Sequence, residues 1–182
     1  MKRLAILLLA FVLPGMAAAT DYKVQTAASQ LGFSAVFQGE SFDGHFGQWT
    51  AAINYDPANL ASSKFDVDVT LASVKTGDND RDSALPGKAF FDIAQFPDAH
   101  FVTTGFRRNG AQVIADGELT LHGVSKPASL DVSFKPQASG ATLDVSGTVK
   151  RLDFGVGSGD YADTSVIGPD VKIRAHLQLL AE

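Results

Sequence analysis

The densest group of side chains that could bind a ligand is the run Asp78–Asp82, which contains three aspartates, Asn79 and Arg81. The aspartates at 78, 80 and 82 have the spacing of a calcium-binding loop. However, Ser83 stands where that loop needs glycine, and Ala89 stands where it needs glutamate. Arg81 could instead donate hydrogen bonds to a phosphate or a carbonyl group. The alternative is a solvated loop that caps a short helix. No metal site is predicted.

The four histidines, at positions 45, 100, 122 and 176, are the other candidates for metal binding or acid–base chemistry. No two of them have the spacing of a helical zinc motif. Strand alternation places each on the face opposite its apolar neighbours, so they are predicted to be outward or turn residues. His122 precedes Gly123-Val124 and is expected to pin the hairpin there.

Nucleophilic and phosphate-binding motifs are also missing. The chain has no cysteine, which excludes disulfides, thiolate catalysis and zinc–thiolate sites. No serine lies in a G-x-S-x-G motif, and the glycine-rich run Gly155–Asp160 lacks the Lys-Ser/Thr of a phosphate-binding loop. The sequence therefore predicts no catalytic residue, no required cofactor and no enzyme. The segment Gly155–Pro169 is expected to be a long loop, which could act as a lid.

Two further charged pairs have structural interpretations. Arg151 and Asp153 flank a bend and are predicted to form an ion pair. Asp66 and Asp68 are predicted to lie on one outward face of a strand, where like charge discourages association of strand edges.

The elements that must position these residues are β-strands. Apolar residues alternate with small or polar residues through most of the chain, which predicts eight long strands with one apolar and one wet face. The segments are Leu31–Phe37, Phe42–Tyr55, Phe65–Leu71, His100–Phe106, Val113–Leu121, Ala128–Phe134, Leu143–Val149 and Val171–Leu179. The chain has 17 aspartates and only 3 glutamates, which favours turns over helices.

This pattern predicts an all-β fold in which sequential strands pair in antiparallel. Eight strands either close into a barrel or split into two packed sheets, and strands of this length favour the barrel because closure removes exposed edges. One short helix is expected in the loop around residues 78–95. It should end near Ala84, because Leu85 precedes Pro86.

The N-terminus has the pattern of a secretory signal peptide over residues 1–19. Lys2 and Arg3 are followed by the apolar run Leu4–Leu13 and by the small residues Ala17–Ala19. The alternative, a membrane anchor, is disfavoured because ten helical residues reach only about 15 Å of a ~30 Å hydrocarbon core. Cleavage predicts one mature domain, residues 20–182, in the periplasm.

The mature chain is acidic. Loss of Lys2 and Arg3 changes the formal net charge from −5 to −7. Nucleic acids and anionic membranes require a basic surface, so neither is an expected partner.

The inward rows mix large and small residues, as in Phe33 and Ala35 or Leu119 and Gly117. Such rows either leave a groove or form a tapered, fully packed core. The 13 phenylalanines favour the groove slightly, because phenylalanine has no polar group that a hydrocarbon would leave unpaired.

Together, a set of short motifs resembles the YceI-like family of periplasmic, lipocalin-like polyisoprenoid-binding proteins, over essentially the whole mature chain. The motifs are Phe42-Asp43-Gly44-His45-Phe46, Asp56-Pro57, Ser73-Val74-Lys75-Thr76-Gly77, Arg81-Asp82, Phe90-Phe91-Asp92, Phe96-Pro97, Phe101, Gly117–Pro127 and Arg151-Leu152-Asp153-Phe154-Gly155.

The resemblance implies an eight-stranded, lipocalin-like barrel with an apolar tunnel that takes an isoprenoid chain. Relatives joined to membrane b-type cytochromes point toward a ubiquinone-like ligand and a cytochrome partner. Asn79, Arg81 and Asp82 are expected to rim the mouth and meet the ligand's head group. The expected tunnel lining is Phe33, Phe37, Phe42, Phe46, Phe65, Val67, Val69, Leu85, Phe90, Phe91, Phe101, Leu119, Leu121, Leu130, Phe134 and Phe154.

The leading functional hypothesis is therefore a periplasmic carrier that holds a polyisoprenoid lipid or quinone inside the barrel. The alternative is a stress or interaction module with a packed barrel, which docks to a membrane cytochrome or an envelope protein. The sequence leaves open whether the chain is a monomer or a homodimer that associates through an outer face.

Overall fold

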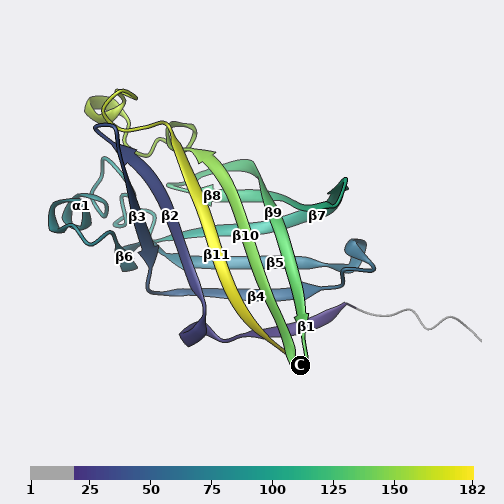
Figure 1. Cartoon of the computed structure of the whole chain (residues 1–182). Coiled ribbons are helices and arrows are strands. Elements are labelled where there is room, and N and C mark those ends of the chain that lie inside the picture. Colours follow the sequence, from purple (N-terminus) through teal and green to yellow (C-terminus); the bar gives the residue numbers. More distant parts are fainter. Residues whose placement is uncertain (1–18) are drawn as a thin grey trace, which may run out of the picture.

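The computed structural model describes residues 19–182, and its regular structure is nearly all β-strand (Figure 1). The predicted signal peptide falls outside the described residues, apart from Ala19. The strands are β1 (Thr20–Val24), β2 (Gln30–Phe37), β3 (Glu40–Phe46), β4 (Trp49–Tyr55), β5 (Lys64–Thr70), β6 (Val74–Lys75), β7 (Asp98–Asn109), β8 (Gln112–Leu121), β9 (Val124–Gln137), β10 (Gly140–Lys150) and β11 (Asp170–Ala181).

Helices are short. The helices are α1 (Asn79–Ala84) and the 3-10 turns η1 (Thr26–Ala28), η2 (Leu60–Ser62), η3 (Leu71–Ser73), η4 (Arg151–Phe154) and η5 (Gly159–Tyr161). Helix α1 ends at Ala84 as predicted, and the Asp78 side chain caps its N-terminus by accepting from the Arg81 amide at 2.9 Å. Within residues 19–182, no helix is long and apolar enough to cross a membrane.

Eight strands close into the predicted antiparallel barrel, in the order β1-β4-β5-β7-β8-β9-β10-β11 and back to β1. Strand β11 closes it. One edge of β11 pairs with β10, and its other edge is shared between two strands. At its C-terminal end Ala181 lies opposite Tyr22 of β1, whereas Ile173 lies opposite Phe33 of β2.

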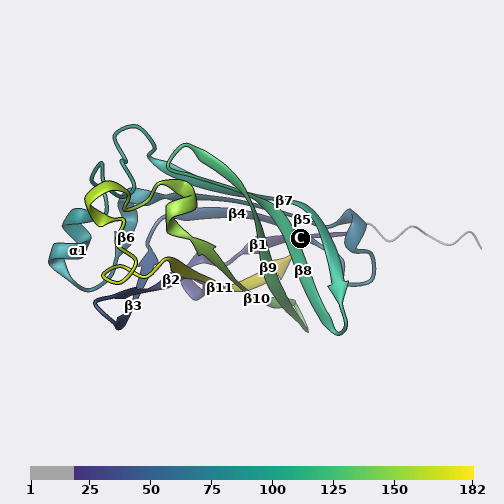
Figure 2. The ribbon, with the colours of Figure 1, turned by 90° about the horizontal axis from the view of Figure 1, so that it is seen from above.

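Strands β2, β3 and β6 continue the sheet beyond β11 at one end of the molecule (Figures 1 and 2). The predicted continuous segment Phe42–Tyr55 is therefore wrong. It breaks at Gly47-Gln48 into β3 and β4, which pair with different neighbours. Backbone hydrogen bonds hold this break against η3, from Gly47 N to Ser73 O at 3.1 Å and from Thr70 N to Gln48 O at 3.0 Å.

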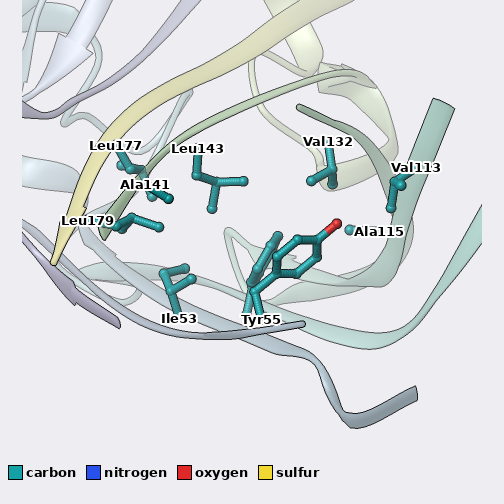
Figure 3. Packing of buried hydrophobic residues seen from close by; sticks show 10 residues of the cluster. Ile53, Tyr55, Val113, Ala115, Val132, Ala141, Leu143, Leu177 and Leu179 are labelled. Carbon is teal, nitrogen blue, oxygen red and sulfur yellow. The ribbon is translucent and has the colours of Figure 1, made fainter. Parts of the chain in front are cut away.

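Alternation along the strands sends apolar side chains inward, where they form two clusters. The hairpin-end cluster lies near β1 and the chain's C-terminus (Figure 3): Ile53, Tyr55, Phe65, Val113, Ala115, Val132, Ala141, Leu143, Leu177 and Leu179. The loop-end cluster lies at the opposite end and includes residues from three loops: Phe33, Ala35, Leu71, Val74, Phe91, Ala99, Phe154 and Val156.

Two glycines in the inward rows, Gly44 and Gly117, are covered by aromatic rings from neighbouring strands. A Cβ on Gly44 would lie 2.4 Å from the Phe33 ring, and one on Gly117 would lie 2.6 Å from the Phe101 ring. These small residues therefore make room for aromatic packing and do not by themselves leave a groove.

Between the two clusters runs a third layer of inward apolar side chains that are only partly buried. Strand register places Ala51, Val67, Phe101 and Leu119 side by side on four successive strands. We call this set, with Val145 and Ala175 of β10 and β11, the middle layer. Its members face the barrel interior, yet each keeps solvent-accessible surface. Ala51, Val145 and Ala175 also pack against the hairpin-end cluster, and Leu119 packs against the loop-end cluster.

Candidate functional site

The residues predicted to line a tunnel are distributed over the loop-end cluster, the hairpin-end cluster and the middle layer. Phe33, Phe91 and Phe154 belong to the loop-end cluster, and Phe65 belongs to the hairpin-end cluster. Several predicted lining residues pack against the loop-end cluster: Phe42, Phe46, Val69, Leu85, Phe90, Leu119 and Leu121. Leu130 and Phe134 pack against the hairpin-end cluster, whereas Val67 and Phe101 lie in the middle layer.

Phe37 has a different position. It lies at the end of β2, outside both clusters, and 38% of it is exposed. Its backbone forms a bridge with Ile167, so this residue contacts the loop after η5 rather than the interior.

Aromatic contacts fasten the loops to the strands at the loop end. The Phe46 ring lies 5.7 Å from the Phe33 ring and 6.3 Å from the ring of Phe91, which comes from the loop after α1. The Arg81 guanidinium lies over the Phe42 ring, 4.4 Å from its centroid. This cation–π contact joins α1 to the outermost full strand, β3.

Two of the three residues of the predicted head-group rim, Arg81 and Asp82, already interact with neighbouring side chains. The Asp82 carboxylate accepts from both the backbone amide and the hydroxyl of Thr76, each at 2.7 Å. The Thr76 hydroxyl is the main reason that the pKa of Asp82 lies below its usual value. Arg81 donates to Thr76 Oγ1 at 3.3 Å and lies 3.6 Å from Asp78, whereas Asn79 is exposed.

Arg151 organises the loop between β10 and β11. It is 4% exposed, and its guanidinium donates to four backbone carbonyls: Gly168 at 3.1 Å, Val156 at 3.1 Å, Gly157 at 2.5 Å and Ile167 at 2.9 Å. Burial lowers the pKa of this guanidinium. The predicted ion pair with Asp153 is wrong, because Asp153 is exposed and the Arg151 donors point to these carbonyls.

Further bonds tie the same loop to the rest of the structure. His122 Nδ1 lies 3.0 Å from the Phe154 carbonyl, so this histidine pins the β8–β9 hairpin to η4. The amide of Gly168 donates to Val36 at 2.9 Å. Strand β10 leaves β9 after Ser146, and η4 lies against β9 beyond that point (Figure 2). The loop therefore helps to complete the barrel wall.

Two grooves of about 650 Å³ each reach the outside of the barrel. The outer groove follows the wet face of β8–β11 and β2–β3 and includes Asp43, Asp131, Asp144, Arg174 and His176. The side groove lies where β2–β3 separate from β4–β5. It is lined by Thr26, Ser29, Gln30, His45, Phe46, Gly47, Gln48, Trp49, Thr50, Asp68 and Thr70.

Comparison with known proteins agrees with this architecture. The YceI-like domain model matches residues 22–179. The chain belongs to the YceI-like family. A UPF0312 protein of Pseudomonas savastanoi pv. phaseolicola is 32% identical over 176 residues, which cover 90% of this chain and 92% of that protein.

Two solved structures share the fold of this YceI-like protein. Burkholderia cenocepacia BcnA is 28% identical, with a TM-score of 0.81 over 85% of this chain and 98% of that one. A polyisoprenoid binding domain from Saccharophagus degradans is 19% identical, with a TM-score of 0.65 over 90% of this chain and 99% of that one.

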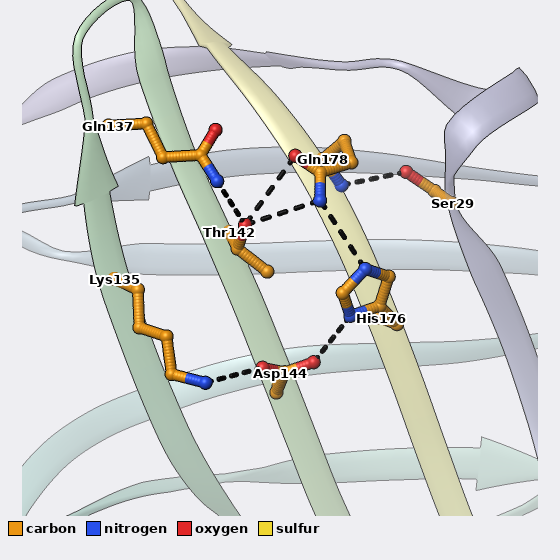
Figure 4. A network of polar contacts seen from close by, with 7 residues as sticks. All are labelled: Ser29, Lys135, Gln137, Thr142, Asp144, His176 and Gln178. Atoms are coloured by element: carbon orange, nitrogen blue, oxygen red, sulfur yellow. Dashed lines mark hydrogen bonds and ion pairs between the residues drawn. The ribbon is translucent and has the colours of Figure 1, made fainter.

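On the outer face of this YceI-like barrel, charged residues join neighbouring strands. His176 lies 2.6 Å from Asp144 and extends a polar network to Gln178 and Thr142 (Figure 4). His45, His100 and His176 are outward as predicted, whereas His122 is a half-buried turn residue with a φ of 52°.

Strand pairing also assembles one group that sequence spacing missed. Ligand atoms of Asp66, Asp68 and His100 lie within 4.8 Å of one another and could hold a cation. Asp66 already bonds Lys64 and His100, each at 2.8 Å, and these bonds lower its pKa. The expectation that Asp66 and Asp68 protect an edge is wrong, because β5 pairs on both sides.

We expect Asp82→Asn to destabilise the protein more at pH 7 than at pH 3. Because the folded-state pKa is lowered, ionised Asp82 stabilises the fold above its usual pKa near 3.8, and this contribution disappears as the pH falls through the folded value. Urea unfolding of the variant and the unmodified protein at several pH values measures this difference in the free energy of unfolding. Asp80→Asn, an exposed residue of the same helix, is the control. Equal losses at both pH values would contradict this account.

We expect Arg151→Met to loosen the loop between β10 and β11. Methionine keeps much of the apolar volume but leaves four loop carbonyls without their donors, which costs roughly 3 kcal/mol or more. Hydrogen exchange at Gly157 and Gly168 should accelerate more than exchange in β10. Uniform acceleration throughout the barrel would show that the residue stabilises the whole fold instead.

Proposed function

We propose that this protein is an exported, periplasmic binding protein that holds a long apolar amphiphile, a polyisoprenoid lipid or an isoprenoid quinone, inside its barrel. The observation that carries the proposal is the middle layer. Val67, Phe101 and their neighbours face the interior without the burial that a fully packed core gives such residues. A hydrocarbon chain in this layer would cover the remaining apolar surface.

The energetics suit a ligand without strong polar recognition. Each buried methylene contributes about 0.8 kcal/mol, so an isoprene unit contributes roughly 3 kcal/mol before the costs of ordering and association. The middle layer offers no charged group to oppose such a chain. The polyisoprenoid-binding domain from Saccharophagus degradans, which shares the fold, supports this class of ligand.

A binding role also agrees with the positions of the titratable groups. The histidines at 45, 100 and 176 and the carboxylates of Asp66, Asp116 and Asp144 lie on the outer face or at its margin. All of these groups except His45 form ion pairs there. Catalysis inside the barrel would need such a group in the middle layer. We therefore propose a carrier rather than an enzyme, and a quinone ligand would suit a membrane cytochrome as the partner.

One observation favours the alternative of an interaction module. Four of the five exposed large apolar residues among the described residues, Val36, Phe37, Tyr161 and Val166, lie on segments of the loop end. A docking partner could cover them whether or not the barrel holds a ligand. Ligand analysis separates the two functions.

The direct test is mass spectrometry of an organic extract of the purified, exported protein. We expect a polyprenyl lipid or quinone in near-stoichiometric amount, and we expect added ubiquinone or polyprenol to raise the Tm of stripped protein. An extract without such a molecule, together with no thermal shift, would leave the interaction module as the better account.

We expect Ala51→Leu to weaken ligand binding at least tenfold while the protein still folds. Ala51 is a partly buried member of the middle layer, so a larger side chain there would occupy ligand space. The matched control is Ala52→Leu, which enlarges the next residue of β4 on the exposed face. Titration with ubiquinone measures both variants, and equal affinities would contradict a ligand in the middle layer.

A further inference from the structure

The side groove is lined by residues that pack against both apolar clusters. Its two large apolar lining residues are Phe46 and Trp49, which flank the break between β3 and β4. Phe46 packs against the loop-end cluster, and Trp49 packs against the hairpin-end cluster. The groove therefore reaches the level of the middle layer, where Ala51 follows Trp49 inward along β4.

The position of the groove follows from the way the barrel closes. Strand β11 pairs with β1 near its C-terminal end and with β2 from His176 toward its N-terminal end. The connection η1 bridges the two strands, and β3 and β4 separate on the other side (Figure 1). Strands β3 and β4 are consequently not paired with each other here, and the side groove lies between the two sections of sheet.

Polar side chains surround Phe46 and Trp49 in the side groove, and most of them do not hydrogen-bond to one another. Seven of them make no side-chain hydrogen bond to any residue within 19–182: Thr26, Gln30, His45, Gln48, Thr50, Asp68 and Thr70. The exception among the polar residues of the side groove is Ser29. Its hydroxyl donates to the Gln25 carbonyl and accepts from the Gln178 amide. Amide and hydroxyl groups therefore remain available to a ligand.

The charge of the groove selects among possible ligand head groups. Among residues 19–182, no lysine or arginine lines it, whereas Asp68 does. The nearest lysine along the sheet, Lys75, lies opposite His45, but its ammonium lies 3.8 Å from Asp82. Cationic donors strengthen phosphate binding, and the Asp68 carboxylate in the side groove would repel a phosphate.

We propose that the side groove is the head-group site of the bound amphiphile, and that it takes an uncharged hydrogen-bonding group, an alcohol or a carbonyl, rather than a phosphate. This inference rests on the proposed function, because it assumes a chain in the middle layer. It replaces the predicted rim at Asn79, Arg81 and Asp82. Asp82 and Arg81 in that rim bind Thr76, and Arg81 also packs on Phe42.

Trp49 provides a direct probe, because it is the only tryptophan in the chain and lines the groove. Stripped protein is titrated with geranylgeraniol and with geranylgeranyl phosphate, which share one hydrocarbon chain, and binding is followed by calorimetry and by Trp49 fluorescence. We expect geranylgeraniol to bind at least tenfold more tightly and to change the Trp49 emission in step with the heat.

A charge placed in the groove should reverse this preference. Thr50→Lys should raise the affinity for geranylgeranyl phosphate at least tenfold, and Gln48→Lys, on the neighbouring exposed residue, should act in the same direction. Thr148→Lys on the exposed face of β10, outside both grooves, is the control and should leave the preference unchanged. Circular dichroism confirms that each variant folds.

The outcomes separate the two claims. Binding of neither compound, by calorimetry as well as fluorescence, would overturn the proposed function. Equal or tighter binding of the phosphate by the unmodified protein would overturn the head-group inference alone. The same holds if geranylgeraniol binds without any change in Trp49 emission, or if Thr50→Lys and Gln48→Lys behave like Thr148→Lys.

Discussion

The hydrogen bonds along one edge of β11 determine the shape of the whole molecule. Because β1 occupies the C-terminal part of that edge and β2 occupies the rest, the sheet closes tightly at one end and continues outward at the other. The closed end packs around Leu143 and Tyr55. At the other end, strands alone do not complete the wall, and loops lie between them. The side groove lies at the boundary between the closed end and the loop end.

Completion of the loop end depends on few but strong contacts. Arg151 donates hydrogen bonds to four carbonyls of one loop. The Asp82 carboxylate accepts from Thr76 and so joins α1 to the end of β6, and the Phe91 ring packs on Phe46. A buried guanidinium that bonds only carbonyls fixes the loop's backbone without needing a particular partner side chain. This arrangement completes the wall at the loop end, while the side chains of the middle layer stay only partly buried.

Alternation of residue types predicted most of the strands, the closed barrel and the outward histidines, because the pattern reports directly on which face is buried. It missed β1, a five-residue strand with too few apolar positions to show a period, and it joined β3 to β4 across Gly47. Arg151 was assigned the wrong partner because backbone carbonyls carry no sequence signal. The Asp66–His100 contact depends on strand register over 34 residues, and the side groove depends on the split at β11. Neither can be seen in local sequence.

We propose a bound state in which an isoprenoid chain lies between the two apolar clusters with its head group in the side groove. Isotope-filtered nuclear Overhauser effects from bound geranylgeraniol to methyl-labelled protein test it most directly. We expect contacts from the chain to the methyl groups of Val67 and Leu119, and from the carbon bearing the hydroxyl to Thr50. Contacts confined to exposed methyl groups such as those of Val166 and Leu180 would contradict it.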